Sequence, residues 1–141
     1  DTKHKHVFKM GVESEINAFV KKAKGPYPLI WLAYPFQEEH SLKKVNVDNL
    51  TLIITVKGDT ETFLEDRFEK IFKNILYNIF DEIKYLLSKT QNIKITSDYD
   101  LVKFPNYIKL EDGKQKNKSI DVWDAVKVSF NCTINDKCSK L

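Results

Sequence analysis

The sequence predicts an α+β fold, in which a mostly antiparallel sheet of about four strands carries a short N-terminal helix and one long amphipathic helix packed on one face. Two observations lead to this class. Residues 62–88 repeat apolar side chains at helical spacing over about seven turns. The apolar stretches 28–36 and 50–56 follow one another without a helical pattern between them, and strands connected in this way favour antiparallel pairing.

The length of 141 residues is enough to bury one conventional core, so we expect a single domain over 1–141. Within it we expect a flexible N-terminus at 1–10, a flexible polar loop at 110–120 and a frayed C-terminus at 136–141. No apolar run approaches the roughly 18 residues that a membrane-spanning helix needs. The sequence therefore indicates no membrane partner.

The basic residues argue against sequence-specific binding of nucleic acid. The formal net charge is only +3, and of the 23 basic residues Arg67 alone is an arginine. Proteins that read bases or clamp phosphates rely on the bidentate fork of arginine, which lysine does not reproduce.

The first half of the chain contains one predicted helix and two predicted strands. Residues 12–24 carry an apolar stripe at helical spacing, and Gly25 followed by Pro26 is a typical helix stop. The short apolar run 28–36 is bounded by prolines and predicts a buried strand. The polar stretch 37–49 is interpreted as a loop, and residues 50–57 alternate as a strand does.

The long helix opens the second half and is followed by strands. Residues 93–95 begin a short strand, and a second apolar patch at 101–104 stops at Pro105. Residues 126–134 form the clearest strand, because apolar and polar side chains alternate strictly along it. One of its sides is therefore expected to be buried and the other wet.

The two cysteines lie close together in sequence without forming a recognisable site. Alternation places Cys132 on the buried side of its strand, where a cysteine behaves as a small apolar residue. Cys138 lies beyond the strand, so a disulfide or reactive pair is the alternative to an unpaired structural Cys132. No CxxC motif or nearby histidine completes a zinc site, and we expect no metal.

No pattern in the sequence indicates catalysis or a cofactor. His4 and His6 lie in the N-terminus and His40 in the polar stretch, and all three are interpreted as solvated. The carboxylates of the long helix are interspersed with lysines, which is typical of a wet, partly ion-paired helix face. Neither a nucleophile–base arrangement nor a glycine-rich phosphate loop is present in the sequence. We expect a protein that is not an enzyme.

Taken together, these stretches resemble the small tail-terminator, tail-completion and neck proteins of tailed bacteriophages, of the type found in phages of the Bacteroides group. The resemblance covers most of the chain. It rests on the order of a short helix, PLIWLAYPF, NLTLIITVK, the long helix TFLEDRFEKIFKNILYNIFDEIKYLLS and a closing strand that begins DVWDAVKVSF.

The resemblance implies a structural virion subunit that forms a ring, often hexameric, which caps the tail tube and joins it to the head connector. Its implied partners are other copies of the chain and the adjoining neck and tube proteins, and DNA passes through the lumen without specific contacts. Polar positions of the 111–118 loop and of the wet strand side are the candidates for subunit or lumen contacts: Lys114, Lys116, Lys118, Lys127, Ser129, Asn131 and Thr133.

Two other classes of protein share this element order. One is a small α+β domain that binds a ligand or catalyses a reaction, and the other is an accessory protein that binds a single partner. For the lysines of the 111–118 loop, the simpler interpretation is that they form a solvent-exposed surface that keeps the protein soluble.

Overall fold

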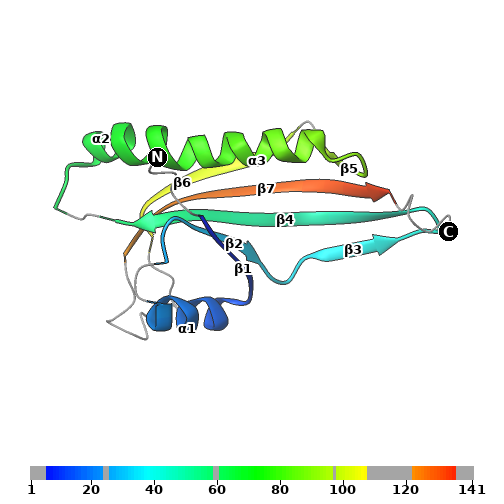
Figure 1. Ribbon diagram of the computed structural model, residues 1–141, viewed down its shortest axis with the longest axis horizontal. Coiled ribbons are helices and arrows are strands. Elements are labelled where there is room, and N and C mark those ends of the chain that lie inside the picture. The colour runs from blue at the N-terminus through cyan, green and yellow to red at the C-terminus, as the bar shows by residue number, and fades with distance from the viewer. Residues whose placement is uncertain (1–5, 24–25, 59–60, 97, 108–121, 136–141) are drawn as a thin grey trace.

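The computed structural model describes residues 6–23, 26–58, 61–96, 98–107 and 122–135. Within them, seven strands form one sheet, and helices lie on both of its faces (Figure 1). The predicted loop at 110–120 and the predicted frayed end at 136–141 lie outside the described residues, as does Cys138.

The sheet is mixed and larger than the predicted four antiparallel strands. Its central pair is β4 (Lys44–Lys57) and β7 (Trp123–Asn135), which are antiparallel. On one side of this pair, β2 (Leu29–Ala33) and β3 (Gln37–His40) each pair with β4, and β1 (Val7–Gly11) extends the sheet in parallel with β2. On the other side, β5 (Ile93–Ile95) and β6 (Asp100–Tyr107) each pair with β7.

Two of the additional strands arise where the sequence predicted no strand. Backbone pairing with β2 draws Val7–Gly11 into the sheet, although 1–10 was expected to be flexible. The predicted loop 37–49 contains β3 and the first part of β4, which together form a hairpin. All four residues of β3 are exposed, so this strand carries no buried–exposed alternation from which it could be predicted.

The long helix was predicted correctly in position. It consists of α2 (Leu64–Arg67), a π-helical segment η1 (Phe68–Leu76) and α3 (Tyr77–Lys89). Its buried side chains pack on one face of the sheet against alternate residues of β4 and β7. Three of the predicted apolar positions, Phe63, Leu64 and Leu86, are instead exposed. No described helix has the length and apolarity that crossing a membrane requires.

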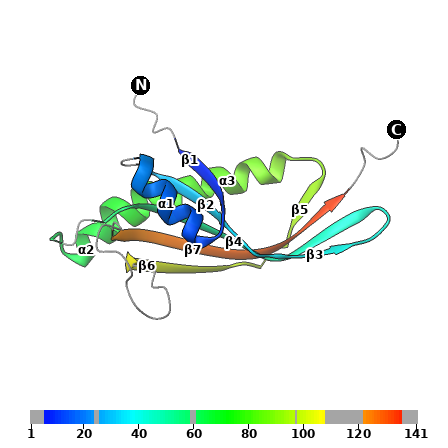
Figure 2. The same cartoon turned by 90° about the horizontal axis from the view of Figure 1, so that it is seen from below.

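The two helices do not share a face, contrary to the prediction. Helix α1 (Glu13–Ala23) places Ile16 and Val20 in a second core on the opposite face, with Trp31 of β2 and Trp123 of β7 (Figure 2). This arrangement explains why Leu52–Val56 is buried continuously, because one end of β4 is covered on both faces. We refer to the two faces as the long-helix face and the α1 face.

Both tryptophans of the second core have hydrogen-bond partners for their indole nitrogens. Trp31 Nε1 donates to the Gly11 carbonyl oxygen at 2.8 Å, and Trp123 Nε1 donates to the Tyr27 hydroxyl at 2.8 Å. The two rings meet edge to face with centroids 6.5 Å apart. The core under α1 therefore buries large aromatic side chains without leaving their polar atoms unpaired.

Candidate functional site

The structure brings the predicted contact residues of β7 together on the α1 face, beyond the part that α1 covers. Lys127, Ser129, Asn131 and Thr133 alternate with the four residues Val126, Val128, Phe130 and Cys132, which lie in the core beneath the long helix. The expected buried side of the strand is confirmed for these four residues, whereas Ile134, which was expected on the same side, is exposed. Asn131 is exposed, while Lys127, Ser129 and Thr133 are half-buried among their neighbours.

Three of these four side chains bond to the neighbouring strand β4. Ser129 Oγ lies 3.3 Å from Thr51 Oγ1, and Thr133 Oγ1 donates to Asn46 Oδ1 at 2.8 Å. They form a ladder of polar side chains across the central pair, which we call the polar sheet surface. Cross-strand pairs of this kind stabilise a sheet, so these residues have a structural role independent of any partner.

Asn131 has a further structural role opposite an irregularity in β4. The register between β4 and β7 shifts between Val47 and Leu50, and Asn49 adopts a left-handed conformation with φ 55°. The backbone N–H of Asn49 donates to Asn131 Oδ1 at 2.9 Å. The side chain of Asn131 thus satisfies a donor that the bulge removes from the β ladder.

The other three predicted contact residues, Lys114, Lys116 and Lys118, lie outside the described residues. Their position relative to the polar sheet surface stays a prediction.

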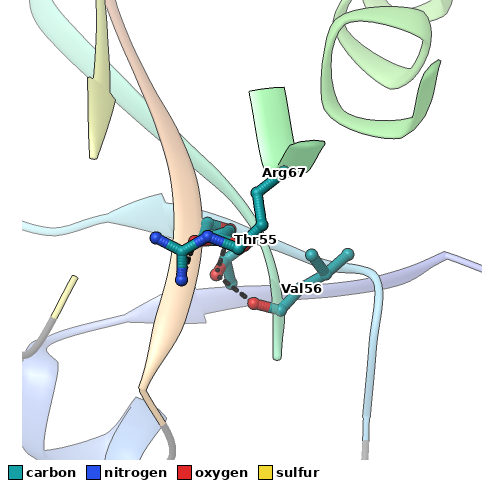
Figure 3. A network of polar contacts seen from close by, with 4 residues as sticks. Thr55, Val56 and Arg67 are labelled. Carbon is teal, nitrogen blue, oxygen red and sulfur yellow. Dashed lines mark hydrogen bonds and ion pairs between the residues drawn. The ribbon is translucent and has the colours of Figure 1, made fainter. Parts of the chain in front are cut away.

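A buried ion pair connects the long helix to the sheet and was missed by the sequence analysis. Arg67 Nη1 lies 3.9 Å from Asp124 Oδ1, and the two side chains are 4% and 0% exposed. Figure 3 shows the Arg67 side chain extending from the helix toward the sheet beside Thr55, whose Oγ1 donates to the Asp124 carbonyl oxygen at 3.0 Å. The signal in the sequence was that Arg67 is the single arginine, because arginine is favoured over lysine in buried pairs.

An apolar cavity of about 190 Å³ opens between α3, β5 and the segment before β6. It is lined by Phe80, Leu87, Ile95, Tyr99 and Phe130, with Thr96 and Lys84 completing the wall. Lys84 Nζ lies 3.2 Å from Asp81 Oδ1 and donates to the Tyr99 hydroxyl at 3.4 Å. The hydrogen bond to Asp81 raises the pKa of Lys84, which keeps the ammonium charged at the wall of the cavity.

The strand β1 exposes apolar side chains at the edge of the sheet. Phe8 is 57% exposed and Met10 54%, and Val12 beyond the strand is also exposed. The N–H of Val7 donates to the Pro28 carbonyl oxygen on the β2 side. Since backbone groups alternate in direction along a strand, those of Phe8 and Met10 point away from β2. This edge was missed because the sequence predicted a flexible terminus there.

The remaining candidate residues show no convergent chemistry within the described part of the chain. Cys132 is buried as predicted, and burial raises the pKa of its thiol. His6 Nε2 lies 3.5 Å from Glu82 Oε2, and His40 is exposed in β3. Among the described residues, no three His, Cys, Asp or Glu side chains gather in a way that would hold a metal ion.

Comparisons of the chain with protein-family models, with curated proteins and with solved structures found no match.

Proposed function

We propose that this chain is a structural subunit of a tailed-bacteriophage virion, a tail-terminator or neck protein that assembles into a ring, with a hexamer as the expected order. In this proposal the ring caps the tail tube and joins it to the head connector, and DNA passes through the lumen without specific contacts. The proposal assigns the chain no catalytic activity and no cofactor. Its phage assignment rests on the sequence resemblance, and its assembly part rests on the surface of the molecule.

The observation that carries the assembly part is the edge strand β1. Exposed strand edges pair readily with other chains, and proteins that stay monomeric block them with charges. The edge strand β3 has such charges in Glu38 and Glu39, whereas β1 has a single one, Lys9, whose ammonium lies over the Phe19 ring, and it also exposes Phe8 and Met10. An edge that is apolar and has outward backbone groups fits a contact with a neighbouring copy.

The opposite edge of the sheet offers a different surface. It is formed by β5 and β6, and Val102 of β6 is exposed there. A contact between two different edges is heterologous, and such contacts generate rings when the rotation between copies closes. A contact between these two edges would close a ring, whereas pairing of β1 with the β1 of a second copy would give a two-fold dimer.

Native mass spectrometry and negative-stain imaging of the full chain test the proposal. We expect closed rings of one order. The double variant Phe8→Lys/Met10→Lys should dissociate them, whereas the matched double variant Tyr85→Lys/Leu86→Lys, on an equally exposed part of α3, should not. A chain that stays monomeric at every concentration up to about 1 mM would contradict the proposal.

A ligand-binding α+β domain is the second candidate, and the apolar cavity beside Lys84 is the observation that favours it. The cavity exceeds the roughly 150 Å³ space in which a buried benzene fits. Ligand-observed NMR with a library of small aromatic and aliphatic acids tests this candidate. Binding at micromolar affinity by a strictly monomeric chain would favour it over the virion subunit.

A further inference from the structure

The apolar cavity between α3 and β5 is larger than an ordinary packing defect. Protein interiors are packed as densely as organic crystals, and the few voids in them rarely exceed the size of a water molecule. This cavity has a volume of about 190 Å³, whereas a cavity of about 150 Å³ lined by apolar side chains is known to bind benzene. A space of this size accepts one aromatic ring with a short substituent.

The wall of the cavity comes from elements that the fold already holds in place. Phe80 and Leu87 belong to α3, Ile95 to β5 and Phe130 to β7. The rings of Phe80 and Tyr99 meet edge to face with centroids 5.3 Å apart, which gives one side of the wall a defined aromatic surface. Cavities of this kind, apolar and formed before a ligand arrives, are typical of small-molecule sites.

A single cation lies at this wall. Among the described residues that line the cavity, Lys84 alone is charged. Its Nζ lies 4.9 Å from the centroid of the Phe80 ring and 5.6 Å from that of Tyr99, so the ammonium rests against the aromatic surface. The hydroxyl of Thr96 lies 3.1 Å from two backbone carbonyl oxygens and is engaged with the protein itself.

The partners of Lys84 leave its ammonium accessible to a ligand. An ammonium has three donors, and Lys84 Nζ lies 3.2 Å from Asp81 Oδ1 and 3.4 Å from the Tyr99 hydroxyl. The side chains of Lys84 and Asp81 are 42% and 66% exposed, and ion pairs that are open to water contribute little free energy. A carboxylate on a ligand can therefore bind beside Asp81 or replace it at small cost.

These features select one chemical class of ligand. An apolar space with one cation at its wall is complementary to a molecule that has an apolar body and one negative charge. A sugar or a dianion would bring polar groups against the aromatic and aliphatic wall, where they would lose water without gaining partners. A ligand that carries a cation would be repelled by Lys84.

We propose that this cavity binds an aromatic monocarboxylate of about seven to ten non-hydrogen atoms, with its ring against Phe80, Tyr99 and Phe130 and its carboxylate at the Lys84 ammonium. The inference goes beyond the proposed function and does not depend on it, because the whole site lies within one chain. It is the site that the second candidate function would use, and each subunit of a ring would carry it as well.

The first test compares acids with the amides of the same shape. Chemical-shift titrations of the full chain with benzoate, phenylacetate, benzamide and phenylacetamide measure the four dissociation constants. We expect at least one of the acids to bind with a Kd of about 1 mM or tighter, and its amide about fivefold more weakly, since the amide has no charge to offer Lys84.

The second test asks whether Lys84 causes this preference. Lys84→Met keeps an unbranched side chain and removes the ammonium, so the ratio of the two constants should fall to about one. The matched control is Lys89→Met, because Lys89 Nζ lies 5.4 Å from the Tyr85 ring on the same helix but outside the cavity, and it should keep the ratio. Asp81→Asn removes the competing carboxylate and should tighten binding of the acid about twofold or more.

The third test fills the cavity. Leu87→Trp should abolish binding of acid and amide alike, and an unchanged circular dichroism spectrum and melting temperature would show that the variant folds. Ile95→Phe fills the space from the β5 side and serves the same purpose if Leu87→Trp does not fold.

The inference would be overturned if neither acid bound at concentrations up to about 10 mM. It would also be overturned by a preference for the acid that persists in Lys84→Met, or by binding that persists in a folded cavity-filling variant. Ring formation is measured separately by native mass spectrometry. Rings without binding would leave the proposed function standing and remove this inference, whereas binding by a chain that forms no rings would do the reverse.

Discussion

The ion pair between Arg67 and Asp124 provides the sharpest test of how the long helix is held on the sheet. Replacing Arg67 with methionine keeps an unbranched side chain about as long as the aliphatic part of arginine and removes the guanidinium group. The Asp124 carboxylate, which is fully buried, would then lose its cationic partner. Removing one member of a buried pair typically costs about 3–5 kcal/mol, because the remaining charge stays in the interior and loses its opposite charge.

The chain offers an exposed pair on the same helix as a control. Lys73 Nζ lies 3.6 Å from Glu69 Oε2, and the two side chains are 67% and 69% exposed. Water and salt screen such a pair, so Lys73→Met should cost less than about 1 kcal/mol. The contrast between the two Met variants therefore isolates burial as the cause.

Urea unfolding followed by circular dichroism measures both values, at one protein concentration for all variants so that any assembly contributes equally. Single-domain proteins are stable by about 5–15 kcal/mol, so Arg67→Met should remain measurable in most of this range. The double variant Arg67→Met/Asp124→Asn should lose less stability than the sum of its two single variants, since the second substitution removes the negative charge of the buried Asp124. The reasoning fails if Arg67→Met costs no more than Lys73→Met, or if the two single effects simply add.

Two further predictions concern β7. Asn131→Ala should cost about 0.5–1.5 kcal/mol in urea unfolding, because the exposed Asn49 N–H loses its acceptor at the bulge, and a cost below about 0.3 kcal/mol would show that water replaces the bond. Cys132→Val should lower stability slightly and leave assembly intact, so loss of rings in a folded variant would mean that this site was misjudged. Burial raises the pKa of Cys132 above its ordinary value of 9.0, so the folded state binds the thiol proton more tightly. Stability should therefore fall as the pH rises above about 9, and this fall should be weaker in Cys132→Val.

The position and the buried side of the long helix could be predicted because a single face of apolar residues repeats over many turns. The same holds for the second part of β7, where alternation along the strand placed Cys132 inside and Asn131 outside, although Trp123–Val126 at its start is buried on both faces. These elements have one buried side, and a regular period along the chain is sufficient to identify it.

The strands β1 and β3 followed from tertiary structure alone. Edge strands are held by backbone hydrogen bonds to a neighbouring strand. When all side chains of such a strand are exposed, as in Gln37–His40, its sequence shows no alternation of apolar and polar residues from which the strand could be predicted. The sequence could not predict that the two helices lie on opposite faces either. An amphipathic stripe indicates that a helix packs on a sheet, but it does not indicate on which face.

The sequence by itself determined the α+β class, the two long elements and the polarity of each side of β7. Only the tertiary structure decided the sheet order, the pairing of Arg67 with Asp124 across 57 residues of sequence, and the placement of the two helices on opposite faces. Periodicity is a local property of the chain, whereas these contacts join segments far apart in it. Their energies depend on burial and distance, which arise when the sheet forms.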